Sequence, residues 1–199
     1  LNIVDATHLK RNLHLTIQLL EANVPTLVAM NMMDALQKKG FNLNVEKLQD
    51  MLGIDVELIA ARKNEGIAEL IDRLPTLSHK KSFNLYYGLI IETAISNIRK
   101  LIDETPKHLD SRWIAIQLLE GNDGIYRSLS LSEETNIRQI IDETERKIID
   151  EKVALSLKGA IFNKRREFIH KLYHSCVEVI PGVHIENKPK LITIDRYLT

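Results

Sequence analysis

Several features that would point to a particular class of protein are missing from this 199-residue sequence. Its single cysteine excludes an intramolecular disulfide and is typical of a reducing compartment. Its 27 basic and 27 acidic side chains cancel, so a nucleic-acid partner is not indicated. No uncharged apolar run approaches the roughly 20 residues that span a bilayer, and no signal peptide is present. We therefore expect a soluble, cytoplasmic chain that binds no nucleic acid.

The sequence also lacks the phosphate-binding string G-x-x-x-x-G-K-[S/T]. In proteins that hydrolyse nucleoside triphosphates, the backbone N–H groups and the lysine of this loop hold the phosphates, and its hydroxyl binds Mg²⁺. The first residue, Leu1, is not an initiator methionine and falls within an expected strand. We expect that the sequence begins inside a domain, that any Mg²⁺ site lies upstream, and that this stretch alone is catalytically inactive.

A short apolar segment that follows Pro25 delivers two polar side chains, Asn31 and Asp34, at its C-terminal end. In an open parallel α/β sheet, ligands bind outside the carboxyl ends of the strands. The Asp34 carboxylate can accept two hydrogen bonds from guanine, while the Asn31 amide reaches N7; adenine has no donor on that edge. Charge-assisted bonds of about 1.5–3 kcal/mol each would give a guanine preference of roughly a hundredfold or more. The alternative is a polar turn in which Asp34 caps a helix.

The first 75 residues alternate between strand and helix patterns. Strands are expected near 1–5, 24–31 and 54–59, and helices near 9–20, 34–40, 45–52 and 67–74. This order predicts right-handed crossovers and a parallel sheet. The segment Ala60, Ala61 and Arg62 follows the third strand. The loop that contains this segment and the loop after the second strand are therefore expected to meet at one nucleotide base.

The remainder of the chain has a helical pattern. A polar segment, 75–81, separates it from the first part, and four helices are expected near 85–102, 110–121, 132–150 and 150–179. We predict an α/β fold, namely a partial small-GTPase-like parallel sheet with flanking helices over 1–75, followed by an all-α domain over 76–180. A tail over 181–199 completes the sequence.

Several short sequence segments resemble those of one family of proteins. They are Val-Asp-Ala-Thr at 4–7, Arg-Asn-Leu at 11–13, Ala-Met-Asn-Met-Met-Asp at 29–34, Val-Glu-Lys-Leu at 45–48, Leu-Gly at 52–53, Ala-Ala-Arg at 60–62, Glu-Gly-Ile at 65–67 and Ile-Asp-Arg-Tyr-Leu-Thr at 194–199. Together they resemble the second half of the G domain of FeoB, the bacterial ferrous iron transporter, with the helical domain that follows it. The resemblance is strong over 1–75, weaker over 76–180 and supportive again at the end.

The resemblance implies a guanine-nucleotide-binding region, with GTP or GDP and Mg²⁺ as cofactors, that regulates Fe²⁺ uptake. Its implied partners are the transmembrane domain of the same polypeptide and a possible homo-oligomer, and its implied place is the cytoplasmic face of the bacterial inner membrane. Asn31, Met32 and Asp34 match the guanine motif, with Met32 in place of the usual lysine. Ala60 stands where many GTPases have a serine, while the backbone N–H groups of Ala61 and Arg62 can meet the guanine oxygen.

Three other groups of residues have side chains that could bind a metal ion, react or contact a membrane. His170 and His174 lie one helical turn apart and, with Glu167 and Glu178, could hold Zn²⁺ or Fe²⁺, although i, i+4 histidine pairs are common on surface helices. Cys176 is expected to be a small core residue. The basic run at 164–166 is expected to be a solvated face, or alternatively a contact for anionic lipid headgroups.

Two further functions remain alternatives at the level of sequence. One is a non-catalytic α/β plus helical module that only docks protein partners. The other is a GTPase of the ribosome-assembly type, against which the balanced charge argues, since RNA binding depends on basic side chains.

Overall fold

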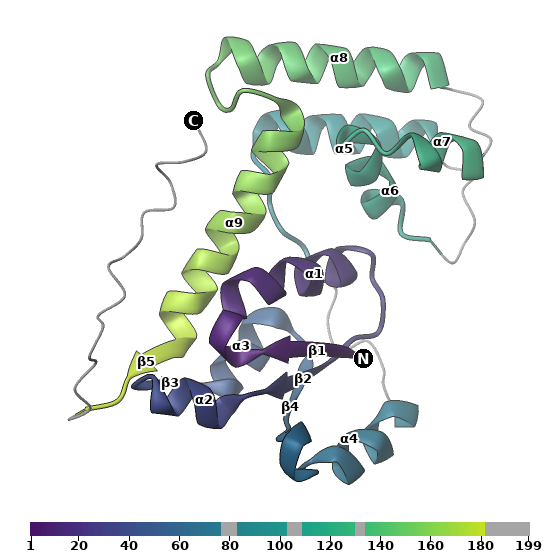
Figure 1. Cartoon of the computed structure of the whole chain (residues 1–199). Helices are drawn as coiled ribbons and strands as arrows, with labels where there is room; N and C mark the ends of the chain where they lie inside the picture. The colour runs from purple at the N-terminus through teal and green to yellow at the C-terminus, as the bar shows by residue number, and fades with distance from the viewer. Residues whose placement is uncertain (77–82, 103–108, 130–133, 182–199) are drawn as a thin grey trace.

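The computed structural model describes residues 1–76, 83–102, 109–129 and 134–181, which form an α/β part and a helical part (Figure 1). The strands are β1 (Asn2–Asp5), β2 (Leu27–Asn31), β3 (Phe41–Leu43), β4 (Asp55–Leu58) and β5 (Val177–Val179). The helices of the α/β part are α1 (Leu9–Glu21), α2 (Met33–Lys38), α3 (Val45–Leu52) and α4 (Ile67–Arg73), with 3₁₀ turns η1 (Ala6–His8), η2 (Ala61–Lys63) and η3 (Leu74–Thr76). The helical part contains α5 (Leu89–Leu101), α6 (Ser111–Leu119), α7 (Asp123–Leu129), α8 (Glu134–Asp150) and α9 (Leu157–Cys176).

The central sheet is parallel, as the alternation of strands and helices predicts. Its order is β1-β2-β4, and Asp5 lies opposite Asn31 in the register. One face packs against α1, α3 and the second half of α9, and α4 covers part of the other face (Figure 1). All three strands point the same way, so the residues that follow them gather at one edge.

Local sequence signals explain where several elements begin. The side chain of Asn44 accepts a hydrogen bond from the N–H of Lys47 (2.9 Å) and caps α3, which ends at the left-handed Gly53 (φ 70°). The Asp110 side chain likewise accepts from the N–H of Trp113 (3.0 Å) at the start of α6. These caps confirm the expected starts of both helices.

Some expected elements were wrong. The last helix does not run to 179: it ends at Cys176, and β5 pairs antiparallel with β3, a strand that the sequence pattern did not reveal. Strands of three residues are too short to show an alternating pattern. Leu85 precedes α5 rather than lying in it, α7 was not expected, and six residues separate α8 from α9. The tail beyond Pro181 lies outside the described residues.

The helix α9 belongs to two hydrophobic cores. Its first half contributes Ala160 and Ile161 to a core formed with α5, α6 and α8. Its second half contributes Ile169, Leu172 and Cys176 to the core of the α/β part. In Figure 1, α9 accordingly runs from the helical part down to the sheet. Within the described ranges, no helix combines the length and the apolar character needed to cross a membrane.

Candidate functional site

The ends of β2 and β4 are joined by one side chain. Asn31, the last residue of β2, is half-buried, and its Oδ1 accepts from the backbone N–H of Met32 (2.8 Å) and of Ala61 (3.4 Å). Because the carbonyl end of the amide is held by both loops, its NH₂ end is oriented as a donor. The sequence thus brings its two candidate segments, 31–34 and 60–62, together as expected.

Met32 adopts an uncommon backbone conformation at this edge. Its φ of 65° lies in the left-handed region, which costs a non-glycine residue roughly 1–2 kcal/mol. Backbone strain of this kind is found where a site must be held in one geometry. Met32 is the N-cap residue of α2, so the alternative in which Asp34 caps the helix is wrong.

Asp34 lies in the first turn of α2 and is exposed. Within the described part of the chain its carboxylate takes part in no hydrogen bond or ion pair, so both acceptor oxygens face solvent. A carboxylate in this position is available to accept hydrogen bonds from a ligand.

The loop after β4 is a closed hairpin. The N–H of Ala60 donates to the carbonyl of Glu65 (3.0 Å), and the N–H of Glu65 donates back (3.3 Å). Gly66 ends the loop at φ +73°, and an added Cβ would lie 2.4 Å from the carbonyl oxygen of Leu58. Only glycine fits there. The N–H of Ala61 is already used by Asn31, which leaves the N–H of Arg62 as the donor at the tip of the loop.

A cluster of side chains also stabilises the end of β1, the remaining strand of the parallel sheet. Asp5 accepts from the N–H and the hydroxyl of Thr7 (2.8 Å each) and contacts Nδ1 of His8 at 3.0 Å. Burial alone would raise the pKa of Asp5, but the hydrogen bonds from His8 and Thr7 outweigh it and hold the pKa below its usual value. All three strands therefore end in loops that are fixed by side-chain hydrogen bonds.

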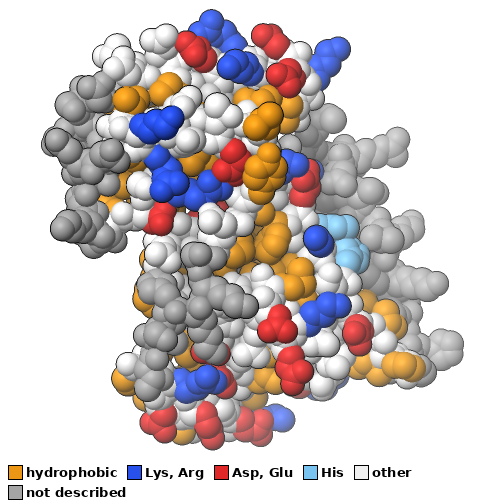
Figure 2. Space-filling view, turned by 180° about the vertical axis from the view of Figure 1, so that it is seen from behind, with side chains coloured by type: hydrophobic (Ala, Val, Ile, Leu, Met, Phe, Trp, Pro, Cys, Tyr) orange, Lys and Arg blue, Asp and Glu red, His pale blue; other side chains and the backbone are white. Residues whose placement is uncertain are grey.

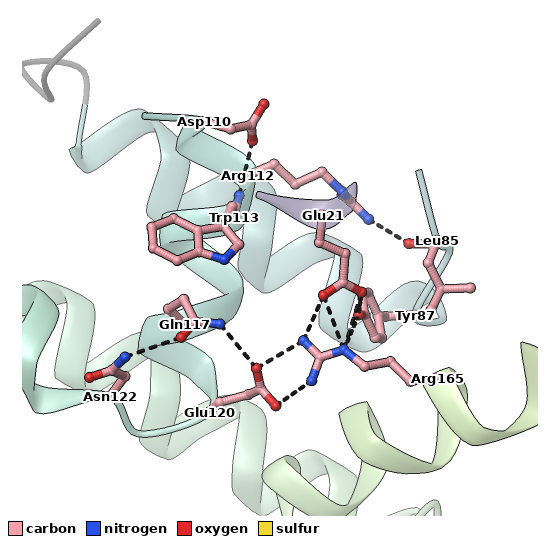
Figure 3. A network of polar contacts seen from close by, with 10 residues as sticks. All are labelled: Glu21, Leu85, Tyr87, Asp110, Arg112, Trp113, Gln117, Glu120, Asn122 and Arg165. Atoms are coloured by element: carbon pink, nitrogen blue, oxygen red, sulfur yellow. Dashed lines mark hydrogen bonds and ion pairs between the residues drawn. The ribbon is translucent and has the colours of Figure 1, made fainter. Parts of the chain in front are cut away.

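A buried ionic network lies where the two parts of the molecule meet (Figure 3). Arg165 of α9 donates from Nη2 to Glu21 at the end of α1 (2.8 Å) and from Nη1 to Glu120 after α6 (2.6 Å). The hydroxyl of Tyr87 also donates to Glu21. The side chains of Arg165 and Glu21 are only 2% and 3% exposed, so neither charge has water as an alternative partner.

This network corrects the expectation for the basic run at 164–166. Arg165 is not part of a solvated face; it is the central cation between the α/β and helical parts. Burial alone would lower the pKa of Arg165, but hydrogen bonds to Glu120 and Glu21 raise it above its usual value. Burial and the nearby Glu21 charge raise the pKa of Tyr87. Helical spacing gives no signal for this network, because its partners are 45 to 144 residues apart.

The structure does not bring together the four side chains considered as possible metal ligands. Among the described residues no group of three His, Cys, Asp or Glu side chains could hold a metal ion. Glu167 instead pairs with Lys164 (2.8 Å). Cys176 is fully buried, as expected of a core residue.

Comparison with known proteins gives one family for both parts. A family model described as "Ferrous iron transport protein B" matches residues 1–74, and one described as "FeoB cytosolic helical domain" matches residues 87–178. The Fe(2+) transporter FeoB of Staphylococcus aureus is 33% identical over 182 residues, which are 89% of this chain. The chain spans 27% of that relative's length.

Two solved structures of NFeoB from S. thermophilus have the same arrangement. A mutant bound to GDP is 31% identical, with a TM-score of 0.77 over 88% of this chain and 67% of that chain. A second mutant bound to GMPPNP is 31% identical, with a TM-score of 0.74 over 85% of this chain and 66% of that chain. These likenesses confirm the expected α/β fold with its small parallel sheet, flanking helices and helical domain.

Proposed function

Because the chain belongs to the FeoB family of ferrous iron transport proteins, we propose that residues 31–34 and 60–62, here called the strand-end site, bind the base of a guanine nucleotide. The observation that carries the proposal is the position of Asn31, whose Oδ1 accepts from the loops after both β2 and β4. Asp34, whose carboxylate is exposed, follows Asn31 by three residues in the first turn of α2. The bound GDP and GMPPNP of the two similar S. thermophilus structures support the same ligand class.

Each residue of the site has a distinct part in base recognition. Asp34 accepts from the ring N–H and the exocyclic amine of guanine, and the NH₂ end of Asn31 donates to N7. The N–H of Arg62 donates to the guanine oxygen, since the N–H of Ala61 is already used by Asn31. Met32 covers one face of the base through apolar contact.

In the whole protein we assign this region to the regulation of Fe²⁺ transport by GTP binding and hydrolysis. Its partners would be the membrane-spanning part of the same polypeptide and further copies of the protein, at the cytoplasmic face of the membrane. The residues present do not fit a Mg²⁺ site, because no phosphate-binding string occurs in the 199 residues and no cluster of three carboxylates or imidazoles exists among the described ones. We therefore assign no hydrolytic residue to this chain.

The base site can be tested on the 199-residue chain by NMR titration. Without a phosphate-binding loop the chain forfeits most contacts to a triphosphate, so GDP and GTP should bind with a Kd of about a millimolar or weaker. GDP should nevertheless shift the backbone resonances of Asn31, Asp34 and Arg62, whereas ADP at the same concentration should not. Resonance shifts that GDP and ADP cause equally, or no shifts at all, would contradict base recognition. The non-catalytic protein-docking module would then be the favoured function.

Asp34→Asn provides the matched variant for this titration. It replaces one acceptor oxygen by a donor that faces a donor of the base, and it should weaken GDP binding by at least about tenfold. Asp50→Asn makes the same chemical change at an exposed position of α3 and should leave the titration unchanged. Equal weakening by both variants would show that only net charge matters and would contradict the assigned pocket.

A further inference from the structure

Two histidines converge on the exposed face of α9. His170 and His174 are both exposed, and their Nε2 atoms lie 3.0 Å apart in a hydrogen bond whose donor depends on the tautomer; a metal ion would take the place of the shared proton. The ring centroids are 4.2 Å apart, with an angle of 53° between the ring planes. Figure 2 shows histidine side chains gathered at one place on the face that it draws, with Lys or Arg side chains nearby.

The separation of the two nitrogens matches a chelate. Two metal–nitrogen bonds of about 2.1 Å that meet at about 90° place the nitrogens about 3.0 Å apart. A tetrahedral angle would require about 3.4 Å. We propose that His170 and His174 form a two-histidine site for a divalent transition-metal ion of octahedral or tetragonal preference, such as Ni²⁺, Co²⁺ or Fe²⁺. This proposal is independent of the nucleotide site.

The fold holds the two ligands in place before a metal arrives. Between and beside them, Ile169, Leu172 and Cys176 are buried in the α/β core, which fixes this stretch of α9 as a helix. The ring of Tyr173 contacts that of His174 edge-on, at a centroid distance of 5.5 Å. The backbone that carries both rings is therefore ordered before a metal binds, and a preorganised site binds more tightly than a flexible one.

The charges around the pair set the character of the site. A metal would bind the neutral form of each ring, so binding at this site competes with protonation of the two imidazoles. The ammonium of Lys10, which lies over the Tyr173 ring at 4.5 Å, opposes a dication. No carboxylate in the described part of the chain completes a set of three ligands. The site is thus an open one, in which water fills the other positions and the metal exchanges readily.

Calorimetric titration of the untagged 199-residue chain with Ni²⁺ at neutral pH tests the proposal. One saturable site is expected, and His170→Gln or His174→Gln should each weaken it at least tenfold, because one ligand of a chelate is lost. The double variant His174→Gln with Lys171→His keeps the number of histidines but moves them to adjacent positions, about 100° apart around the helix. It should bind as weakly as His174→Gln alone.

Two further measurements locate the ion and separate the possible outcomes. Co²⁺ should broaden the NMR signals of His170 and His174 selectively, and Lys10→Gln should tighten Ni²⁺ binding several-fold. Anaerobic titration with Fe²⁺ should reproduce the dependence on both histidines. The proposal is overturned if the rearranged pair binds Ni²⁺ as well as the native one, or if removing either histidine leaves the affinity unchanged. Circular dichroism of each variant checks that α9 stays folded.

Discussion

At the scale of single residues, Arg165 has the most consequential surroundings. Its guanidinium is the only cation that contacts the buried carboxylate of Glu21 in the network of Figure 3, and it also reaches Glu120. A buried ion pair contributes little net stability, but removing one partner leaves an uncompensated charge in a dry environment. The planar fork of arginine also makes two parallel bonds to each carboxylate, which lysine cannot do. Arg165 therefore specifies how α1, α6 and α9 meet.

We expect Arg165→Ala to lower the free energy of unfolding by about 3–5 kcal/mol, because Glu21 would remain buried without its cation. Arg165→Lys should recover only part of this loss. Lys158→Ala, at an exposed position of the same helix, should change stability by no more than about 0.5 kcal/mol. Urea unfolding followed by circular dichroism measures all three variants. A loss of less than about 1 kcal/mol for Arg165→Ala would show that water enters the network and that the buried description is wrong.

At the scale of elements, the loop after β4 depends on one glycine. Gly66→Ala places a Cβ against the carbonyl oxygen of Leu58 in addition to a φ of +73°. Gly121 has a similar φ of +79°, but a Cβ there meets nothing. Gly121→Ala should therefore cost about 1 kcal/mol, and Gly66→Ala at least twice that. Thermal unfolding compares them, and the guanine-dependent NMR shift should disappear only in Gly66→Ala. Equal losses of stability in the two variants would show that the backbone at the end of β4 moves to accommodate a Cβ at position 66.

The elements also show how far sequence reasoning extends. Asn44 and Asp110 were recognisable as caps, because a cap acts within three residues of its own position. The candidate loops at 31–34 and 60–62 could be placed together, because parallel strands end at one edge. The pairing of β3 with β5 joins residues more than 130 positions apart and could not be recognised locally. Arg165 was misassigned for the same reason, since its burial depends on three segments that meet only in the fold.

At the scale of the whole molecule, α9 makes the two parts one mechanical unit. It enters both hydrophobic cores, and its end is fixed to the α/β part by bonds on each side of β5. The carbonyl of Cys176 accepts from the N–H of Asn44 (2.8 Å), and the N–H of Ile180 donates to the carbonyl of Gly40 (2.9 Å). A helix fixed at both ends can transmit a displacement of the strand-end loops to the helical part. Because α9 belongs to both hydrophobic cores, we also expect that neither part unfolds alone.

The chain carries one natural reporter in each core. Its single tryptophan, Trp113, packs against the helical core, and its single cysteine, Cys176, is fully buried in the α/β core. In urea, the tryptophan fluorescence and the accessibility of the thiol to pulse labelling should therefore change with the same midpoint. Burial raises the pKa of the Cys176 thiol, so labelling requires that its core open.

Leu13→Ala makes this test specific. Leu13 is fully buried in the α/β core, and its truncation should cost about 2–5 kcal/mol. If α9 and the Arg165 network couple the two parts, the midpoint reported by Trp113 should fall as far as that reported by Cys176, although Trp113 lies in the other core. Ile95→Ala in α5 provides the reciprocal variant, since Ile95 is buried in the helical core. Two separate midpoints would show two independent units: labelling of Cys176 would come first in Leu13→Ala, and the fluorescence change of Trp113 would come first in Ile95→Ala. A nucleotide bound at the strand ends could then have no mechanical route through α9 to the helical part.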